Sequence, residues 1–438
     1  MEKIQSLKGM SDILPPDVYL WQHVEEVVRR FLARYGYEEI RTPMLEESVL
    51  FNRSIGEETD IVNKEMYSFI DKGGRNIALR PEGTAPIVRS FIQHNIDLQD
   101  LVKLYYVGPM FRSERPQKGR SRQFHQIGVE AIGSSNPYVD AGMVVLMKEL
   151  LLNIGISGFE VKLNSLGCST DKKKFAEALH KHFSREKSRL CDDCKVRLDK
   201  NVLRILDCKV ESCRALVRNS PKAKDFLCES CVTHYTKVKE LLTKHTPVEY
   251  KEDGNIVRGL DYYTGTVFEV SHTALGAQDA IAAGGRYDNL IEDFGGKKTG
   301  AIGFAIGMER LLMALPALKR EEILAERSKQ LDLFAVTTSS AAYDKAYEVI
   351  EGLRDKEDIF CEINYDVGRS LKSQMNLANK KNAGFVVIFG DDELKKGEVV
   401  LRNMKTAKQV TVRLDRIYED LKRELLGCTT SGRNGPKD

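Results

Sequence analysis

Residues 101–132, LVKLYYVGPMFRSERPQKGRSRQFHQIGVEAI, contain the pattern that decides the fold of most of the chain. Two runs with the composition of strands, 101–112 and 123–133, flank the polar stretch SERPQKGRSR, which predicts a β-hairpin with a long loop. Further strands are expected at 266–270 and 280–283, and hairpins and glycines join them instead of repeated strand–helix units. This favours an α+β fold, with an antiparallel sheet flanked by helices, over a doubly wound parallel sheet.

The second strand of this hairpin has two different faces, because side chains alternate along a strand. Ile127 and Val129 belong to an apolar face, and Gln126 and Glu130 belong to a polar one. Arg112 ends the partner strand. An arginine, an amide and a carboxylate on one face suit the floor of a polar site. The alternative is a half-exposed sheet face, which antiparallel sheets often have.

The loop between the two strands is strongly basic. One acid, Glu114, stands among five cations, which are Arg112, Arg115, Lys118, Arg120 and Arg122. Repulsion among these charges is relieved by water or by a bound anion, and the planar fork of arginine suits phosphate. The loop is therefore a candidate phosphate site, with a solvated surface loop as the alternative.

Four other segments combine glycine with polar side chains. They are RPEGTAP (80–86), RGLDYYTG (258–265), AGGRYD (283–288) and GAIGFAIGMER (300–310). The last predicts a small-residue strand that enters a helix near Arg310, and its glycines permit the close approach of another strand or of a ligand. The sequence has neither a GxxxxGK[ST] phosphate loop nor a GxGxxG after a strand, so a nucleotide would bind without either loop.

Length and composition indicate a globular protein of several domains. At about 150 residues per domain, 438 residues correspond to about three domains. The 67 Lys and Arg residues nearly balance the 64 Asp and Glu residues, which excludes a uniformly basic surface but not a local basic patch. No apolar stretch approaches the ~20 residues that a bilayer requires, and the N-terminus lacks the apolar core of a signal peptide. We therefore expect a cytoplasmic protein that does not contact a membrane.

The pattern of apolar residues also divides the chain. Apolar residues at helical spacing predict a helix over 20–32, which Gly36 ends, and a second helix over 138–154. After a charged linker helix at 319–330, short apolar runs alternate with helical stretches, which predicts a small α/β domain. The polar tail at 428–438 is expected to be disordered.

These segments resemble, in order, the motifs of one family. FRSERPQKGRSRQFHQIGVE (111–130) resembles motif 2 of the class II aminoacyl-tRNA synthetases, GFAIGMERL (303–311) resembles motif 3, and 36–43 resembles motif 1, which ends in a proline at a dimer interface. RGLDYYTGTVFE (258–269) and AGGRYDNL (283–290) resemble the two signature segments of the histidyl-tRNA synthetases. KGMSDILP (8–15) and RPEGTAPIVR (80–89) also match that family, in its bacterial type. The resemblance extends over about residues 3–425.

The resemblance implies a fold and an activity. It implies a homodimer whose class II catalytic domain, 1–322, is interrupted by an insertion at 166–248 and followed by an α/β anticodon-binding domain at 329–425. The implied enzyme activates L-histidine with ATP and Mg²⁺ to histidyl-adenylate and transfers histidine to the 3′ end of tRNA(His). The alternative is an inactive paralogue that acts as a histidine-sensing regulatory subunit. The C-terminal domain and the retained Arg112, Arg258 and Arg310 argue against that alternative.

The resemblance also implies roles for individual residues. Arg112 and Arg258 are the implied catalytic residues at the α-phosphate, and the ATP-binding residues are Arg112, Glu114, Arg115 and Arg310. The implied histidine-binding residues are Glu82, Gly83, Thr84, Arg112, Gln126, Glu130, Arg258, Tyr262, Tyr263 and Tyr287. Arg115 and Gln117 would approach the acceptor end of the tRNA. A local basic stretch, made of Arg369, Lys372, Lys380 and Lys381, fits phosphate contact or a solvated helix face.

Six of the nine cysteines are concentrated between Cys191 and Cys231. Two CxxC pairs are a signature of zinc, because four thiolates satisfy a tetrahedral ion. We predict a structural zinc ion bound by Cys191, Cys194, Cys228 and Cys231, with free buried thiols as the alternative. Cys208 and Cys213 lie between the pairs, and the spacing is longer than in a usual zinc ribbon.

Overall fold

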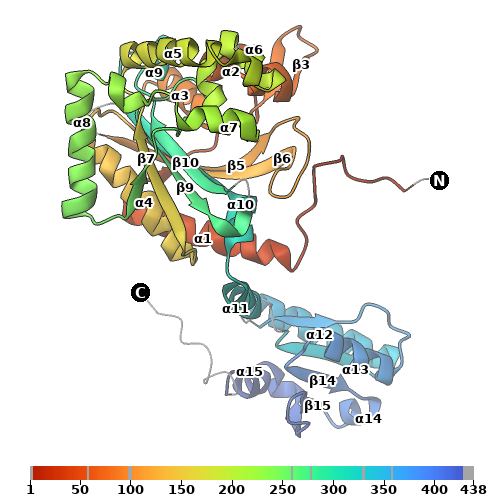
Figure 1. Ribbon diagram of the computed structural model, residues 1–438. Helices are drawn as coiled ribbons and strands as arrows, with labels where there is room; N and C mark the ends of the chain where they lie inside the picture. Colours follow the sequence, from red (N-terminus) through yellow and green to blue (C-terminus); the bar gives the residue numbers. More distant parts are fainter. Residues whose placement is uncertain are drawn as a thin grey trace. The chain divides into compact units, whose positions relative to one another are not determined.

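The computed structural model describes residues 3–56, 59–96, 101–257, 260–276, 279–327, 331–356 and 359–427. It divides into two compact units, Met1–Leu324 and Ala325–Asp438 (Figure 1). Arg258 and the predicted disordered tail at 428–438 lie outside the described residues. Among the described residues, no helix combines the length and the apolar character that a membrane crossing requires.

The first unit is built on an eight-stranded sheet. In spatial order its strands are β1 (Glu38–Glu39), β5 (Val102–Phe111), β6 (Gln123–Ile132), β11 (Ala301–Gly307), β10 (Ala280–Arg286), β9 (Thr264–His272), β7 (Phe159–Ser165) and β8 (Tyr250–Glu252). The predicted hairpin is confirmed as the antiparallel pair β5–β6, in which Tyr106 lies opposite Gly128. The pairs at both edges, β1–β5 and β7–β8, are parallel. The expectation of a purely antiparallel sheet therefore holds for the six inner strands only, because long connections can return the chain to an edge in the parallel sense.

One face of the sheet is covered by the two predicted long helices. These are α1 (Asp17–Arg34) and α4 (Pro137–Ile154). Val24 and Val28 of α1 share one buried core with Ile127 and Val129 of β6. The apolar side of β6 is thus used for packing, which leaves its polar side for the opposite face.

The opposite face carries a smaller sheet and short helices. The small sheet has the order β2 (Leu45–Glu47), β4 (Asn76–Leu79), β3 (Ser68–Ile70), and nearby helices are α2 (Ser48–Ile55), η1 (Ile61–Glu65), α3 (Thr84–Gln93) and α9 (Leu290–Asp293). Strands this short carry too few residues for a two-residue period, and the sequence did not predict them. Of the strand-like run at 39–43, only Glu39 belongs to a strand, β1.

A helical segment connects β7 to β8. Its helices are α5 (Ser169–Ser184), η2 (Lys187–Arg189), α6 (Asp192–Lys200), η3 (Val202–Asp207), α7 (Glu211–Arg218), η4 (Ala223–Phe226), α8 (Glu229–Glu240) and η5 (Leu241–His245). Figure 1 shows α5, α6 and α7 gathered near α2, α3 and α9. Phe175 and Phe183 of α5 belong to the same buried cluster as Tyr263 and Tyr287. The inserted helices therefore share a core with residues predicted to bind histidine.

The remaining elements of the first unit are η6 (Thr273–Leu275), α10 (Met308–Ala314) and α11 (Ala317–Arg327). The α11 helix extends three residues past Leu324, where the second unit begins. The second unit has a five-stranded sheet in the order β13 (Cys361–Ile363), β12 (Leu333–Thr337), β14 (Phe385–Phe389), β15 (Glu398–Asn403), β16 (Gln409–Arg413). Its helices are α12 (Ser340–Lys356), α13 (Leu371–Lys380), α14 (Asp391–Lys395), η7 (Leu414–Arg416) and α15 (Ile417–Gly427). The predicted small α/β domain is confirmed.

Candidate active site

Glu130 is at the centre of a buried polar pocket. Its residue is 1% exposed, on the face of β6 opposite α1 and α4. Tyr287 donates a hydrogen bond from its hydroxyl to Oε2 of Glu130 at 2.6 Å. Thr84 donates from Oγ1 to Oε1 at 2.7 Å. Burial raises the pKa of Glu130 to about 8, although these two hydrogen bonds act to lower it.

A second carboxylate, that of Glu82, lies at the start of α3. It accepts hydrogen bonds from the backbone N–H groups of Thr84 at 2.7 Å and Ala85 at 2.9 Å. Tyr262 also donates to Glu82, at 3.4 Å. Burial raises the pKa of Glu82, and the two backbone donors oppose that rise. The pocket thus contains two acids whose negative charge is disfavoured until a cationic or donor group enters.

Three tyrosine rings form the aromatic part of the pocket. The ring centroids of Tyr262 and Tyr263 lie 4.7 Å apart, and those of Tyr262 and Tyr287 lie 5.9 Å apart in a T-shaped, edge-to-face arrangement. Residues predicted separately from four segments, Glu82, Thr84, Glu130, Tyr262 and Tyr287, are therefore brought together by direct contacts.

Glycines make the space that these side chains occupy. A Cβ atom at Gly303 would lie 1.7 Å from Oε2 of Glu130. Cβ atoms at Gly83 and Gly128 would lie 2.2 and 2.1 Å from the ring of Tyr106. Glycines in these segments were expected to permit the close approach of another strand or of a ligand. These three glycines permit the close approach of side chains from neighbouring segments. Tyr106 was missed, although an aromatic residue opposite a glycine on the paired strand is a usable signal.

The side-chain amide of Gln126 is not fully hydrogen-bonded within the described residues. Its Oε1 is buried and accepts no hydrogen bond from any residue in the described part of the chain. A buried acceptor without a donor costs about 1–3 kcal/mol. An ammonium group, which offers three donors, would satisfy it. This fits the prediction that Gln126 contacts the α-ammonium group of an amino acid.

Arg112 lies beside this pocket with part of its guanidinium unpaired. Its Nε donates to the carbonyl of Pro81 at 3.0 Å, and its guanidinium stacks over the ring of Phe124 at 5.1 Å. Its terminal nitrogens make no hydrogen bond or ion pair to the residues that the structure describes. Burial lowers the pKa of Arg112, while Glu65 and other acids oppose that change. An incoming anion would pair with this cation.

The motif 2 loop, 113–122, is partly held and partly exposed. Arg120 pairs with Glu114 at 2.9 Å, and Arg310 donates from Nε to the carbonyl of Gly119 at 3.2 Å. Arg310 also donates to the carbonyl of Ala280 at 2.8 Å. In contrast, Arg115 and Gln117 are exposed. The loop therefore presents Arg115 to solvent while Arg310 supports the loop from α10.

Arg286, the residue before Tyr287, belongs to a buried ion pair. Arg286, which is 2% exposed, donates to Asp140 of α4 at 2.7 Å. His234 of the inserted helix α8 contacts the other oxygen of Asp140 at 2.8 Å. These residues were not predicted as part of the site. Arg286 lies in the AGGRYD segment, but nothing in the sequence indicates its partner, 146 residues away.

The cysteines of the insertion form two clusters, which corrects the predicted metal site. The first cluster consists of Cys191, Cys194, Cys208 and Cys213, and the second consists of Cys168, Asp171, Cys228 and Cys231. Within each cluster the potential ligand atoms all lie within 4.8 Å of one another. The prediction that Cys191, Cys194, Cys228 and Cys231 share one ion is wrong, because the two CxxC pairs begin separate helices, α6 and α8, that carry them into different clusters.

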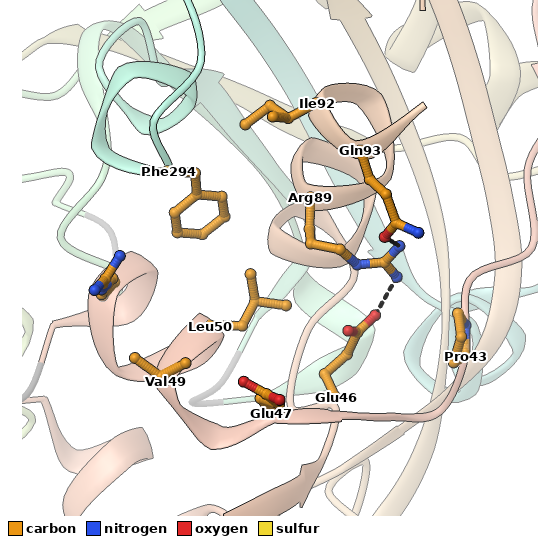
Figure 2. A pocket seen from close by; sticks show the side chains of 10 residues that line it. Pro43, Glu46, Glu47, Val49, Leu50, Arg89, Ile92, Gln93 and Phe294 are labelled. Carbon is orange, nitrogen blue, oxygen red and sulfur yellow. Dashed lines mark hydrogen bonds and ion pairs between the residues drawn. The ribbon is translucent and has the colours of Figure 1, made fainter. Parts of the chain in front are cut away.

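A groove lies beside the motif 1 segment. Figure 2 shows its apolar side chains, Leu50, Ile92 and Phe294, together with the ion pair between Arg89 and Glu46. Pro43, the proline that ends motif 1, also lines it. The groove contains none of the residues predicted to bind histidine or ATP.

Comparison with known proteins agrees with this arrangement. The family model for histidyl-tRNA synthetase matches residues 9–311. The chain belongs to the histidyl-tRNA synthetase family. A family model for the anticodon-binding domain matches residues 332–424, within the second unit.

Relatives of the family are similar over nearly the whole chain. Histidine–tRNA ligase of Halothermothrix orenii is 46% identical over 421 residues, which are 96% of this chain and 99% of the relative. The relative of the same name from Thermodesulfovibrio yellowstonii is 46% identical over 423 residues, again 96% and 99% of the two chains. The crystal structure of apo S. aureus histidyl-tRNA synthetase is 37% identical, with a TM-score of 0.77 over 96% of this chain and 100% of that one.

A structure from Bacillus halodurans, described as an ATP phosphoribosyltransferase regulatory subunit/histidyl-tRNA synthetase, is more distant. It is 22% identical, with a TM-score of 0.63 over 89% of this chain and 99% of that one, and this supports the fold alone. The comparisons therefore favour the synthetase over the regulatory alternative.

Proposed function

We propose that this chain is a histidine–tRNA ligase, which activates L-histidine with ATP and transfers it to the 3′ end of tRNA(His). The observation that carries the proposal is the buried carboxylate of Glu130, held by Tyr287 and Thr84 and given its space by Gly303. A neutral imidazole has one donor and one acceptor nitrogen. A buried carboxylate beside phenol groups matches that pattern. A side chain without it would leave buried polar groups unpaired, which can discriminate by about 10⁴–10⁵.

The remaining pocket residues are assigned to the backbone groups of histidine. Glu82, Gln126 and Thr84 contact the α-ammonium group, supported by the negative charge of Glu82 and the unpaired Oε1 of Gln126. Gly83 lets the chain pass beneath the ring of Tyr106 so that its neighbours reach the pocket. Tyr263 completes the aromatic wall beside Tyr262. The carboxylate of histidine is then directed toward Arg112 and Arg258.

The first reaction joins two anions, the histidine carboxylate and the α-phosphate of ATP. Catalysis of such a step depends on positioning and on compensation of charge. Arg112 and Arg258 are the proposed catalytic residues, since the unpaired end of Arg112 is available to the α-phosphate. Arg310 and Arg115 bind the distal phosphates and Glu114 lies near the adenine. ATP enters as its Mg²⁺ complex, because Mg²⁺ is usually held through substrate phosphates and water.

Two exposed regions are proposed to contact tRNA(His). Arg115 and Gln117, both exposed on the motif 2 loop, approach the acceptor end. In the anticodon-binding domain, Arg369 pairs with Asp366 and Lys381 pairs with Glu362. Lys372 and Lys380 are exposed and make no ion pair to the described residues. These two lysines are therefore the stronger candidates for phosphate contact in that basic stretch.

The proposed assembly is a cytoplasmic homodimer formed through the motif 1 region. Around Pro43 the surface exposes apolar side chains, namely Met44, Leu45, Val49, Phe69 and Ile70. Contiguous exposed apolar groups indicate an interaction surface. The proposed domains are 1–322, with the insertion at 166–248, and 329–425. One structural zinc ion is proposed for the first cysteine cluster.

Histidine-dependent exchange of pyrophosphate into ATP tests the function. The expected result is exchange with histidine and none with other amino acids, followed by histidylation of a tRNA(His) transcript. A chain that binds histidine but gives no exchange would instead be the regulatory paralogue. Arg258→His should lower the single-turnover rate of adenylate formation at least ~100-fold while both substrates still bind. Weaker binding of histidine with a nearly normal rate would assign Arg258 a structural role.

A further inference from the structure

The second cluster of the insertion, defined by Cys168, Asp171, Cys228 and Cys231, has the composition and spacing of a metal site. We propose that it binds a zinc ion of its own through three thiolates and one carboxylate oxygen, so that the insertion contains two zinc ions. The four potential ligand atoms all lie within 4.8 Å of one another. Zn²⁺ takes four ligands in structural sites, and carboxylate oxygen is an accepted ligand beside thiolates.

Two helices present these ligands in the same register. Cys168 is the residue before α5 and Asp171 is three residues later, while Cys228 is the residue before α8 and Cys231 is three residues later. The Cys-x-x-Asp segment is therefore the counterpart of the Cys-x-x-Cys segment. The first turn of each helix directs backbone N–H groups toward its N-terminal end, where they stabilise thiolates and carboxylates.

Asp171 supplies an independent indication of a missing ligand. Its Oδ2 accepts the backbone N–H groups of Cys168 at 3.3 Å and Cys228 at 3.1 Å, and so joins the two helix starts. Its other oxygen, Oδ1, is buried and accepts no hydrogen bond within the described part of the chain. The residue is 1% exposed. A buried carboxylate oxygen without a donor is costly, and a cation bound by the neighbouring thiols would satisfy it.

The first cluster shows the geometry that a zinc ion requires. The sulfur atoms of Cys191 and Cys208 lie 3.8 Å apart. Four sulfurs placed tetrahedrally about 2.3 Å from a zinc ion are separated by about 3.8 Å. The backbone N–H of Cys191 also donates to the sulfur of Cys213 at 3.3 Å. The second cluster also has four potential ligands, with Asp171 in place of one thiolate, and soft thiolates select zinc over the hard cations.

The second ion would fix the helix that supports the histidine pocket. Lys172, next to Asp171 on α5, donates from Nζ to the carbonyls of Asp261 at 2.6 Å and Tyr263 at 3.3 Å. The chain before α5 pairs with the same segment, since Leu166 donates to Gly265 at 2.8 Å. The segment Asp261–Gly265 contains Tyr262 and Tyr263 and continues into β9. This part of the inference rests on the proposed function, and it makes Lys172 a positioning residue.

Elemental analysis of the purified full-length chain tests the metal sites without any assay of activity. The expected content is about two zinc ions per chain, which falls to about one in Cys168→Ser and, separately, to about one in Cys213→Ser. Cys361→Ser is the matched control, because Cys361 is buried in β13 of the second unit and belongs to neither cluster. A wild-type content of one zinc that survives Cys168→Ser would overturn the second site, and so would freshly purified protein without metal.

The identity of the ligand atoms can be tested on the wild type and on Asp171→Cys, a variant that keeps four potential ligands. X-ray absorption at the zinc edge should give an average of about 3.5 sulfur and 0.5 oxygen ligands per zinc in the wild type. Asp171→Cys should retain about two zinc ions per chain and raise the average to about four sulfurs. Four sulfurs in the wild type, or no change in Asp171→Cys, would contradict the carboxylate ligand.

The link to the pocket is tested by comparing two substrates. Lys172→Met and Cys168→Ser should each raise the KM for histidine about tenfold and leave the KM for ATP nearly unchanged. Lys173→Met is the matched control, since Lys173 is the exposed neighbour on α5. Two zinc ions with an unchanged histidine KM would leave the metal site standing and disprove its support of the pocket. Loss of all exchange activity in the wild type would count against the proposed function instead.

Discussion

The proposed histidine pocket, which contains Glu130 of β6, and the motif 2 loop, which precedes β6, satisfy their polar groups in different ways. In the pocket, Glu130 and Glu82 accept hydrogen bonds from fixed donors of α3 and from tyrosines. In the loop, Arg115 is exposed and the terminal nitrogens of Arg112 have no partner among the described residues. Recognition of a small ring requires groups that are already oriented, whereas a phosphate chain can be bound by cations that are completed by the ligand itself.

This difference between the two regions predicts whether a mutation will change the binding of histidine or the rate of the reaction. A residue of the pocket that is already held by its neighbours should affect binding of histidine when it is removed. Removal of a cation that gains its partner only when phosphate binds should affect the step in which charge develops, and should therefore lower the rate.

The largest effect is expected for Arg112→Ala. Removal of one preorganised donor at a reacting group costs about 10²–10³ in rate, or roughly 3–4 kcal/mol. Single-turnover formation of adenylate should fall by that factor, which is far more than the rise in the dissociation constant of histidine. Lys118→Ala is the control within the same loop, because Lys118 is exposed and should leave adenylate formation unchanged. A fall of less than tenfold for Arg112→Ala would remove this residue from the catalytic group.

Loss of the Glu130 carboxylate is expected to be the next largest effect, and it should appear in binding. Glu130→Ala leaves the donors Tyr287 and Thr84 unpaired, and a buried polar group left in this way costs about 1–3 kcal/mol. The KM for histidine should rise up to about 100-fold, far more than the KM for ATP. Tyr287→Phe removes a single hydrogen bond and should give a smaller rise. Equal changes in both KM values would contradict the role of Glu130 in imidazole recognition.

The motif 2 loop should show a smaller effect, which is larger for tRNA than for ATP. Arg115→Ala removes an exposed cation that makes no ion pair to the described residues, so its effect depends on a distant phosphate partner. The KM for tRNA(His) should rise about tenfold at low salt and less at high salt. Steady-state aminoacylation at two salt concentrations measures this change. An equal loss in pyrophosphate exchange would show that Arg115 acts mainly on ATP.

The sequence predicted the parts of the fold and site that repeat over several residues or carry a motif. The alternation along β6 correctly assigned Val129 to the core and Glu130 to the opposite face, because a strand of ten residues shows its period clearly. The short strands β2 and β3 show no such period. Motif resemblance identified Tyr287 but not the Arg286–Asp140 ion pair below it, since a contact between distant segments leaves no local pattern.

The grouping of the cysteines could not be predicted from the sequence for the same reason. Both CxxC pairs were recognised, but each was assigned to the wrong partners. Cys168 and Asp171 precede the rest of the cluster by nearly sixty residues, since Cys228 follows Asp171 by 57 positions. They come together only because the fold places the starts of α5 and α8 next to one another, and spacing along the chain does not report that contact.

The smallest change in the measured quantity, a few degrees in Tm, is expected from a dependence of stability on pH that originates in the pocket itself. Burial raises the pKa of Glu130 from an ordinary value of 4.5 to about 8. Between these two values the unfolded chain has lost this proton and the folded chain keeps it, so stability falls as the pH rises. The fall is about 1.4 kcal/mol per pH unit for a single group. Below pH 4.5 both states are protonated, and above pH 8 both are ionised, so the contribution is constant outside this window.

Glu130→Gln isolates the change of charge, because glutamine stays neutral, its amide oxygen accepts from one of the hydroxyls of Tyr287 and Thr84, and its NH2 group donates to the other. Other buried acids, such as Glu82, are present in both proteins and cancel in the difference. Relative to the variant, the wild type should lose about 2 °C in Tm for each pH unit between pH 6 and 8, and no more above that. Thermal unfolding in the absence of substrates measures the difference. A constant difference across that range would mean that Glu130 is already ionised in the empty pocket, and that the pocket is better solvated than its contacts indicate.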